Sequence, residues 1–268
     1  MPPKEIPESE YGKFQTLLDI VEKLRAPGGC PWDREQTHSS LKRNLLEECY
    51  EVIEAIDNGN FTSLADELGD ILVQVAFHVQ IARESGEFTL ADVLTSINSK
   101  LVRRHPHVFG DVTVTDSREV ERNWEKLKEQ EKGQKGVKSS PVEGIPKDLP
   151  ALTYAQLMQD RVARQGFDWE DISGVLDKIV EEVGELRNAA TDREKAHELG
   201  DLLFSIVNLS RRMNIHSEDA LRQANLRFRG RYSTMEKLAA DAGRDFAQLP
   251  MDEKELLWQE AKRLERSP

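Results

Sequence analysis

Residues 45–54 read LLEECYEVIE, and residues 67–70 read ELGD. Each stretch places two carboxylates three residues apart, a spacing that puts side chains on one face of a helix. When two such helices pack side by side, four acidic groups enter a small volume, where they repel one another unless a cation lies among them. The two stretches therefore predict a helical metal site whose ligands are Glu48, Glu51, Glu67 and Asp70.

Both acid pairs border the apolar stripe of their helix. With about 100° of rotation per residue, Glu48 lies about 60° and Glu51 about 120° from the stripe that begins at Leu45. The acids of the second helix lie at the same angles from its own stripe. Gly69, and Gly200 further along the chain, stand between acids and are expected to allow close backbone approach. Both acid pairs can then line one edge of the core.

The second half of the chain repeats five features of the first half in the same order. The paired segments are 29–33 with 166–170, 47–51 with 181–185, 67–70 with 198–201, 98–104 with 225–231, and 124–128 with 258–262. A repeat of this kind predicts an internal duplication. The second copy predicts a second metal site, with ligands Glu182, Glu185, Glu198 and Asp201.

Helical periodicity extends over most of the chain, and no long stretch alternates like a strand. We expect an all-α protein of two tandem four-helix-bundle-like units, in domains 1–132 and 151–268. Gly, Pro and Ser gather in 133–150, which predicts an interdomain linker. Helices are expected near 11–25, 38–57, 62–79, 89–104, 116–130, 151–165, 171–190, 192–213, 217–240 and 251–265.

Local signals mark several helix ends. Capping boxes are expected at Thr89 with Asp92 and at Thr191 with Glu194, and a simple N-cap at Thr62 or Ser63. Residues 26–33 and 105–107 are expected to form a loop and a turn, because Gly and Pro interrupt the helical pattern there.

The bulk composition excludes several classes of protein. With 37 basic and 49 acidic residues the net charge is −12, so nucleic acid is not an expected partner. The longest apolar runs, such as 71–73, are too short to span a membrane, and the N-terminus lacks the apolar core of a signal peptide. Cys30 and Cys49 are the only cysteines, so we expect no disulfide framework. A cytoplasmic protein is the simplest interpretation.

The alternative to metal binding is that the acids form ordinary solvated helix faces, which are common in acidic chains. Two observations favour a metal: the acids border apolar residues, and the arrangement occurs twice. Carboxylates without paired histidines favour Mg²⁺, with Mn²⁺ as a substitute. A di-iron bundle needs Glu-x-x-His on two helices, and only Glu194 with His197 has that spacing. His197 is expected to be a surface residue beside the site.

Basic residues cluster after the acid motifs in both halves. The clusters contain Lys100, Arg103, Arg104, His105 and His107 in the first half and Arg227, Arg229 and Arg231 in the second. Beside bound Mg²⁺, such cations suit a phosphate chain; the alternative is ion pairing with surface acids. Trp124 and Trp258 are core anchors or stack on a base. The chain has no Gly-rich P-loop.

Together these residues resemble the MazG nucleoside triphosphate pyrophosphohydrolases, which belong to the all-α NTP pyrophosphatases. The resemblance covers about residues 11–265 and rests on GCPWD at 29–33, the repeated acid motifs and the duplicated layout. It implies two MazG units, a homodimer, Mg²⁺ dependence, and hydrolysis of (d)NTP to (d)NMP and pyrophosphate. Broad base tolerance and a housecleaning role are also implied.

In two-domain members of the family the C-terminal unit is credited with hydrolysis. Carried onto this chain, the metal ligands are Glu182, Glu185, Glu198 and Asp201, the triphosphate contacts are Arg227, Arg231 and Lys262, and Trp258 lies near the nucleotide. Position 227 is Arg where the family leads us to expect Lys, so the contact geometry differs. The N-terminal unit is equally equipped, with Glu48, Glu51, Glu67, Asp70, Lys100, Arg104, Trp124 and Lys128.

The expected mechanism is in-line attack of water on the α-phosphorus, with Mg²⁺ activating the water and neutralising the phosphates. Glu181, beside Glu182, is expected to position the water or to hold a further metal; Glu47, beside Glu48, takes that role in the first unit. Two alternatives stay open. One is a base-restricted dUTP or dCTP pyrophosphatase, and the other is a non-catalytic helical metal-binding or interaction module.

Overall fold

The computed structural model describes residues 6–116, 119–120, 123–124, 127, 131 and 140–266. The regular elements in these ranges are all helices, which confirms the all-α fold class. The chain divides into two compact units, Met1–Glu131 and Lys132–Pro268. Part of the predicted linker, 133–139, and most of the predicted helix 116–130 lie outside the described residues.

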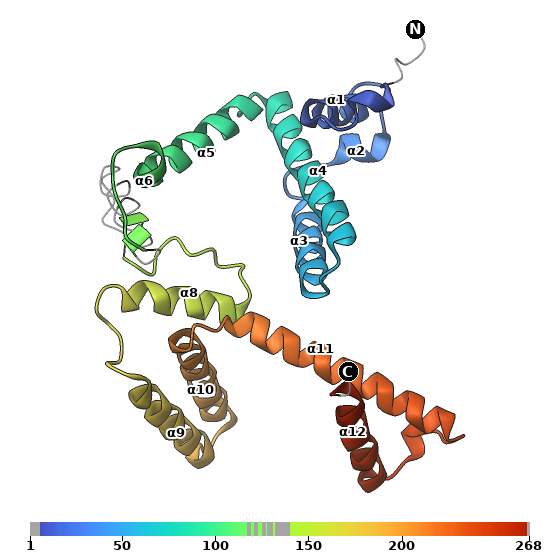
Figure 1. Ribbon diagram of the computed structural model, residues 1–268, viewed down its shortest axis with the longest axis vertical. Helices are drawn as coiled ribbons and strands as arrows, with labels where there is room; N and C mark the ends of the chain where they lie inside the picture. The colour runs from blue at the N-terminus through green and yellow to red at the C-terminus, as the bar shows by residue number, and fades with distance from the viewer. Residues whose placement is uncertain are drawn as a thin grey trace. The chain divides into compact units, whose positions relative to one another are not determined.

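The first unit is organised around a long helix, α4. Its elements are η1 (Glu8–Glu10), α1 (Phe14–Arg25), α2 (Pro31–Glu35), α3 (Lys42–Asp57), α4 (Phe61–Ser85), α5 (Leu90–Arg104) and α6 (Pro106–Phe109). Helices α3 and α4 lie side by side, and α1 packs on α4 (Figure 1). The buried core joins Val21 of α1 to Ala76, Phe77 and Ile81 of α4. The acids of 67–70 lie on earlier turns of α4, away from this core.

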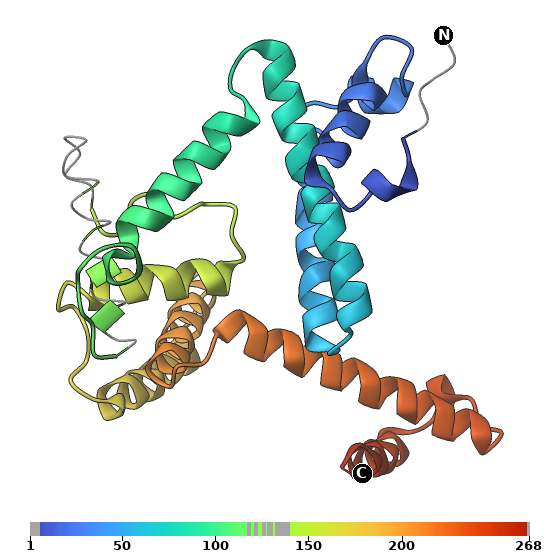
Figure 2. The ribbon, with the colours of Figure 1, turned by 45° about the horizontal axis from the view of Figure 1, so that its top comes forward.

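The second unit also contains two long helices that lie side by side, as α3 and α4 do in the first. Its elements are α8 (Ala151–Ala163), α9 (Ile172–Asn188), α10 (Asp192–Arg212), α11 (Ser217–Asp241), η2 (Phe246–Gln248) and α12 (Met251–Glu265). Helices α9 and α10 lie side by side, α8 packs against α10, and α12 packs on α11. In both views α11 begins beside α8 and leads away from the α9–α10 pair (Figure 1, Figure 2).

No described helix has the length and the apolar character that a membrane span requires.

Both predicted capping boxes are confirmed, at Thr89 with Asp92 and at Thr191 with Glu194. The predicted cap of α4 is wrong. Asn60 is the N-cap, and its side chain accepts a hydrogen bond from the Ser63 backbone N–H at 3.2 Å. Positions 62 and 63 already lie inside the helix, where a hydroxyl cannot act as the N-cap.

Two segments predicted to be a loop and a turn contain short helices. Helix α2 begins at Pro31 and α6 at Pro106. Proline is accepted at the first helical position because the N–H it lacks has no intrahelical partner there. Helix α3 begins at Lys42, later than the predicted start at 38.

The glycines between the acids do not mark a close approach of any residue that the structure describes. A Cβ placed on Gly69 or on Gly200 would meet no atom within 4 Å. The expectation was wrong because no described element packs against this face of α4 or of α10.

Candidate metal centres

Helices α3 and α4 bring three of the predicted ligands of the first unit together. One carboxylate oxygen each from Glu48, Glu51 and Glu67 lies within 4.8 Å of the others. Burial, followed by the charges of Asp70, Glu51 and Glu67, raises the pKa of Glu48 above its ordinary value. Burial, followed by the charges of Glu51 and Asp70, likewise raises the pKa of Glu67. The fourth predicted ligand, Asp70, is therefore near enough to repel the others.

The second unit holds the equivalent cluster of Glu182, Glu185 and Glu198, again with one oxygen from each within 4.8 Å of the others. Glu182 is only 4% exposed. Its Oε2 atom is buried and has no hydrogen-bond partner among the described residues. Burial, followed by the charges of Glu182 and Glu198, raises the pKa of Glu185. This cluster concentrates negative charge around a buried, unsatisfied oxygen.

Lys178 contacts the second cluster from the preceding turn of α9. Its Nζ lies 2.8 Å from Glu182 Oε1 and 2.9 Å from Glu181 Oε1. The hydrogen bonds to Glu182 and then Glu181 raise the pKa of Lys178 above its ordinary value. Sequence reasoning missed this lysine, although its spacing of three and four residues from the acids could have identified it. The first unit has Asn44 at the equivalent position, and so lacks this cation.

Asp201, the fourth predicted ligand of the second unit, contacts His197. The Nδ1 atom of His197 lies 3.0 Å from Asp201 Oδ2 and 3.7 Å from Glu198 Oε1. The His197 side chain is 73% exposed, which agrees with its expected place on the surface beside the site. The structure thus brings three carboxylates into one group and holds the fourth beside that group.

The residues of both clusters fit a hard divalent cation. Their donors are carboxylate oxygens, the type of ligand that Mg²⁺ and Mn²⁺ prefer. A buried polar atom without a partner is rare in native proteins and calls for an unseen ion or water. A cation among the three acids would satisfy Glu182 Oε2 and offset the repulsion that raises the pKa of Glu185.

The predicted phosphate-binding arginines take part in a contact that occurs in both units. Arg104 lies over the Trp124 ring at 5.2 Å and is 2.6 Å from Glu131. Arg231 lies over the Trp258 ring at 5.3 Å and is 2.7 Å from Glu265. In both units the acid follows the tryptophan by seven residues, which extends the duplication beyond the five features found in the sequence.

The predicted phosphate-binding cations of the second unit do not contact its carboxylate cluster within the part of the chain that the structure describes. No contact among the described residues joins Arg227, Arg231 or Lys262 to the Glu182 cluster. Helix α11, which carries both arginines, leads away from α9 and α10 (Figure 2). In the first unit, Lys128 lies outside the described residues.

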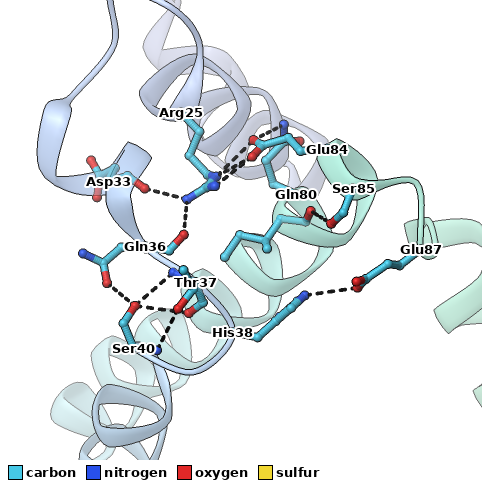
Figure 3. Close-up of polar contacts among 11 residues, drawn as sticks. Arg25, Asp33, Gln36, Thr37, His38, Ser40, Gln80, Glu84, Ser85 and Glu87 are labelled. Atoms are coloured by element: carbon cyan, nitrogen blue, oxygen red, sulfur yellow. Dashed lines mark hydrogen bonds and ion pairs between the residues drawn. The ribbon is translucent and has the colours of Figure 1, made fainter.

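The loop before α3 is held by Arg25, whose side chain is 6% exposed. Its Nη1 donates to the carbonyls of Asp33 at 2.6 Å and Gln36 at 3.0 Å. Its Nε and Nη2 donate to the Glu84 carboxylate (Figure 3). The hydrogen bond from Arg25 lowers the pKa of Glu84. Five hydrogen bonds donated by one guanidinium thus tie the segment containing α2 to the end of α4.

In the second unit the carboxylate of Asp168 holds the equivalent loop, residues 166–170, in place. Asp168 pairs with Arg211 and, at 3.2 Å, with Arg212. Burial raises the pKa of Asp168, but the hydrogen bond and charge of Arg211, with the charge of Arg212, lower it by more, so the net pKa lies below its ordinary value. These ion pairs place Trp169 beside α9.

A cavity of about 690 Å³ opens between α8, α9, α10 and the 166–169 loop. Glu182 and Asp201 line it at one place, and Phe167, Trp169 and Phe204 supply apolar walls. A volume of this size is typical of sites for small organic ligands. The metal cluster and the cavity therefore form one continuous site.

The fold and these centres define the class of protein: an all-α, internally duplicated protein with one carboxylate centre in each unit. Residues 36–109 match the family model described as MazG nucleotide pyrophosphohydrolase domain, and residues 152–227 match the one described as phosphoribosyl-ATP pyrophosphohydrolase.

Several known proteins are similar to this chain over most of its length. The chain is 50% identical to the nucleoside triphosphate pyrophosphohydrolase/pyrophosphatase MazG of Thermotoga maritima, over 93% of this chain and 95% of that protein. It is 43% identical to a nucleoside triphosphate pyrophosphohydrolase of Escherichia coli K12, over 94% of this chain and 98% of that protein. It is also 43% identical to the uncharacterized protein YabN of Bacillus subtilis, of which it covers 55%. The chain belongs to the MazG family of nucleotide pyrophosphohydrolases, which confirms the family and the hydrolase class predicted from the sequence.

Proposed function

We propose that this protein is a Mg²⁺-dependent nucleoside triphosphate pyrophosphohydrolase that converts (d)NTP and water to (d)NMP and pyrophosphate. The observation that carries the proposal is the buried, unpartnered Glu182 Oε2 in a cluster of carboxylates beside a cavity. The names of the relatives from Thermotoga maritima and Escherichia coli support the same reaction.

The carboxylates of Glu182, Glu185 and Glu198, with Asp201 beside them, would hold the metal. When bound, Mg²⁺ supplies the positive charge that neutralises the triphosphate and acidifies a water molecule. Glu181 then accepts a proton from the attacking water, whose oxygen bonds to the α-phosphorus. The bond from that phosphorus to the bridging oxygen breaks, and pyrophosphate leaves. Lys178 holds the Glu181 and Glu182 side chains in place for this step.

Labelled water tests where the attack occurs. Hydrolysis of ATP in H₂¹⁸O should place the label in AMP and leave pyrophosphate unlabelled. Label in pyrophosphate would show attack on the β-phosphorus, and release of ADP and phosphate would contradict the reaction itself.

We propose that the C-terminal unit carries most of the turnover. Both units have the carboxylates, but among the described residues a lysine contacts only those of the second unit, and the first has Asn44 at the equivalent position. A cation beside the cluster compensates part of its charge, so the site can accept both a metal and an anionic phosphate chain. Activity of Glu48→Gln should stay near that of the wild type, and activity of Glu182→Gln should be lost.

We propose that the protein is a homodimer. Each unit exposes apolar side chains that a soluble monomer would normally cover. On the helices α5, α9 and α10 these are Val93, Leu94, Ile97, Leu101, Leu176, Val180, Val183, Leu199, Leu203 and Ile206. Sedimentation equilibrium should give twice the chain mass, and Leu94→Glu with Leu101→Glu should weaken the association.

Among the described residues, Arg227 and Arg231 of α11 and Lys262 of α12 do not contact the Glu182 cluster of their own unit. In a dimer these cations would instead contact a carboxylate cluster of the other copy. Mixing two inactive variants tests this arrangement. Glu182→Gln and Arg231→Leu chains, refolded together, should regain about a quarter of the wild-type activity, since mixed dimers then hold one intact site. No recovery on mixing would show that each site is built from one chain.

We propose broad base specificity, a housecleaning role and a cytoplasmic location. Free Cys30 and Cys49 agree with a reducing compartment. The test is a panel of (d)NTPs with identified products, run on the wild type, Glu48→Gln, Glu182→Gln and the control Glu236→Gln, an exposed acid on α11. One strongly preferred base would favour a dUTP- or dCTP-restricted enzyme. No turnover and no stabilisation by Mg²⁺ would favour a non-catalytic module.

A second substrate class is favoured by one specific observation. Residues 152–227 match the family model described as phosphoribosyl-ATP pyrophosphohydrolase. An ATP substituted on its base is therefore included in the panel. Preferential turnover of phosphoribosyl-ATP over ATP would replace the general (d)NTP assignment.

A further inference from the structure

A second group of potential metal ligands lies beside the carboxylate cluster of the second unit, and it contains a histidine. One ligand atom each from His197, Glu198 and Asp201 lies within 4.8 Å of the others. The Nδ1 atom of His197 is 3.0 Å from Asp201 Oδ2 and 3.7 Å from Glu198 Oε1. Around a cation with bonds of about 2.1 Å, neighbouring ligand atoms lie about 3 to 3.5 Å apart. The three side chains are therefore close to the spacing that one bound cation requires.

The positions of these residues along α10 produce the group. His197 and Asp201 are four residues apart, so their side chains lie on one face of the helix. Helical metal sites place two ligands at this same spacing. The side chain of His197 is 73% exposed and that of Glu198 is 22% exposed, so the group is open to solvent on the histidine side, where a cation can enter.

Among the described residues, the first unit has no equivalent of this histidine group. Asp66 of α4 stands where the second unit has His197. Asp66 is exposed and belongs to no group of potential ligands among the described residues, where the first unit offers Glu48, Glu51 and Glu67. A nitrogen ligand thus distinguishes the second unit from the first.

The histidine group adjoins the unpartnered oxygen of the carboxylate cluster. Glu198 belongs to both groups, and the buried Oε2 of Glu182 in the neighbouring group has no hydrogen-bond partner among the described residues. The two groups together with Glu181 contain five carboxylates, and Lys178 contacts two of them. Five negative charges, one lysine and one divalent cation leave a net charge of −2. A second divalent cation would offset that remainder.

The donor atoms determine which cation suits the histidine group. An imidazole nitrogen beside carboxylate oxygens suits a transition-metal ion such as Zn²⁺, whereas Mg²⁺ prefers ligands that are all oxygen. We propose that His197, Glu198 and Asp201 form a second cation position in the second unit, which takes Zn²⁺ and similar transition-metal ions in preference to Mg²⁺. The proposal rests on the proposed function only for the Mg²⁺ at the neighbouring cluster, since the position itself requires no nucleotide.

The test adds Zn²⁺ to the whole chain in excess Mg²⁺ and without nucleotide. Because Mg²⁺ then occupies the all-carboxylate clusters, equilibrium dialysis should find one tightly bound Zn²⁺ per chain. Imidazole binds a metal as the neutral ring. Long-range ¹H–¹⁵N spectra of the six histidines should therefore show a change at Nδ1 of His197, with the ring proton on Nε2.

Two variants separate this position from adventitious binding by surface histidines. His197→Asp gives the second unit the residue of the first and should weaken Zn²⁺ binding about tenfold or more, because the nitrogen ligand is lost. His216→Gln is the matched control, since His216 also pairs with an acid nearby in sequence, Asp219 at 3.4 Å, outside both groups. It should leave Zn²⁺ binding unchanged.

Each alternative outcome overturns the proposal. Equal Zn²⁺ affinity of the wild type and His197→Asp would do so, as would an unchanged His197 ring or an equal response of His216. Sequential assignment of the wild-type histidines keeps the test valid if His197→Asp does not fold. Failure of the Mg²⁺-loaded protein to hydrolyse NTP would refute the proposed function and leave the Zn²⁺ result standing, so the two failures are distinguishable.

Discussion

The Nζ atom of Lys178 lies 2.8 Å from Oε1 of Glu182, one turn further along α9. The contact occupies one oxygen of a buried carboxylate and leaves the other without a partner. Charge compensation by Lys178 is thus partial, and the remaining oxygen is the place in the second unit where a cation is most needed.

Lys178→Met should lower kcat/KM for NTP hydrolysis by about 10- to 100-fold, the usual effect of removing a group that orients a metal ligand. The reason is that Glu181 and Glu182 lose the ammonium that positions them. The control is Lys195→Met, which removes a 3.5 Å contact with the exposed Asp192 and should leave turnover unchanged. Equal losses in both variants would contradict a specific role for Lys178.

Glu182→Gln should lower kcat by at least about a hundredfold, because the metal loses a charged ligand and with it several kcal/mol of charge stabilisation. The variant should remain folded, since an amide retains an acceptor for Lys178 and lessens the repulsion on Glu185. Urea titration without metal checks this. Unfolding of the variant would instead indicate a purely structural carboxylate.

The Glu182→Gln variant also tests whether the carboxylate clusters bind Mg²⁺. At a free Mg²⁺ concentration of 100 Kd, one binding site should raise the free energy of unfolding by about 2.7 kcal/mol. The shift should be reduced in Glu182→Gln and abolished when Glu48→Gln is added. Chelation of the metal should return the wild type to its metal-free stability; an unfolding curve insensitive to Mg²⁺ would contradict both centres.

The stability of the first unit should depend on pH through His78. The Nδ1 atoms of His38 and His78 lie 2.7 Å apart, and burial followed by the charge of His38 lowers the pKa of His78 from 6.5. Below that value the unfolded chain binds more protons than the folded one. The contribution of neutral His78 to the free energy of unfolding is therefore fully present above pH 6.5. It is lost as the pH falls from 6.5 toward the lowered pKa of His78.

Hydrogen exchange of the α4 amides measures this effect in the first unit alone. Protection should be lower at about pH 5.5 than at about pH 7.5, after correction for intrinsic rates. His78→Gln should reduce the difference. His216→Gln, an exposed histidine of the second unit, should leave it unchanged; the same reduction in both variants would show that another group is responsible.

Arg231→Lys should raise KM for NTP about tenfold with little change in kcat. A guanidinium can lie flat on Trp258 and still pair with Glu265, whereas an ammonium has no planar fork. Arg104→Lys alters the same contact in the first unit and should have little effect if the second unit carries the turnover. A larger effect of Arg104→Lys would reverse the assignment of the units.

Much of this protein is determined by spacing along the chain. The positions of Glu48, Glu51 and Glu67 on two neighbouring helices follow from the helical period, and the duplication follows from the order of the motifs. The capping boxes at Thr89 and Thr191 follow from local side-chain chemistry. The acid spacing and the capping boxes depend on residues close in sequence, and the duplication depends on the order of motifs along the chain, so all three could be predicted.

Only the tertiary structure decided which groups lack a partner. Glu182 and Glu48 stand in the same motif, yet Glu182 is buried beside a lysine and Glu48 is not. The amide of Gln159 is oriented by a carbonyl 45 residues away. Burial and hydrogen-bond satisfaction depend on what other helices place nearby, and the spacing within one helix carries no record of those neighbours.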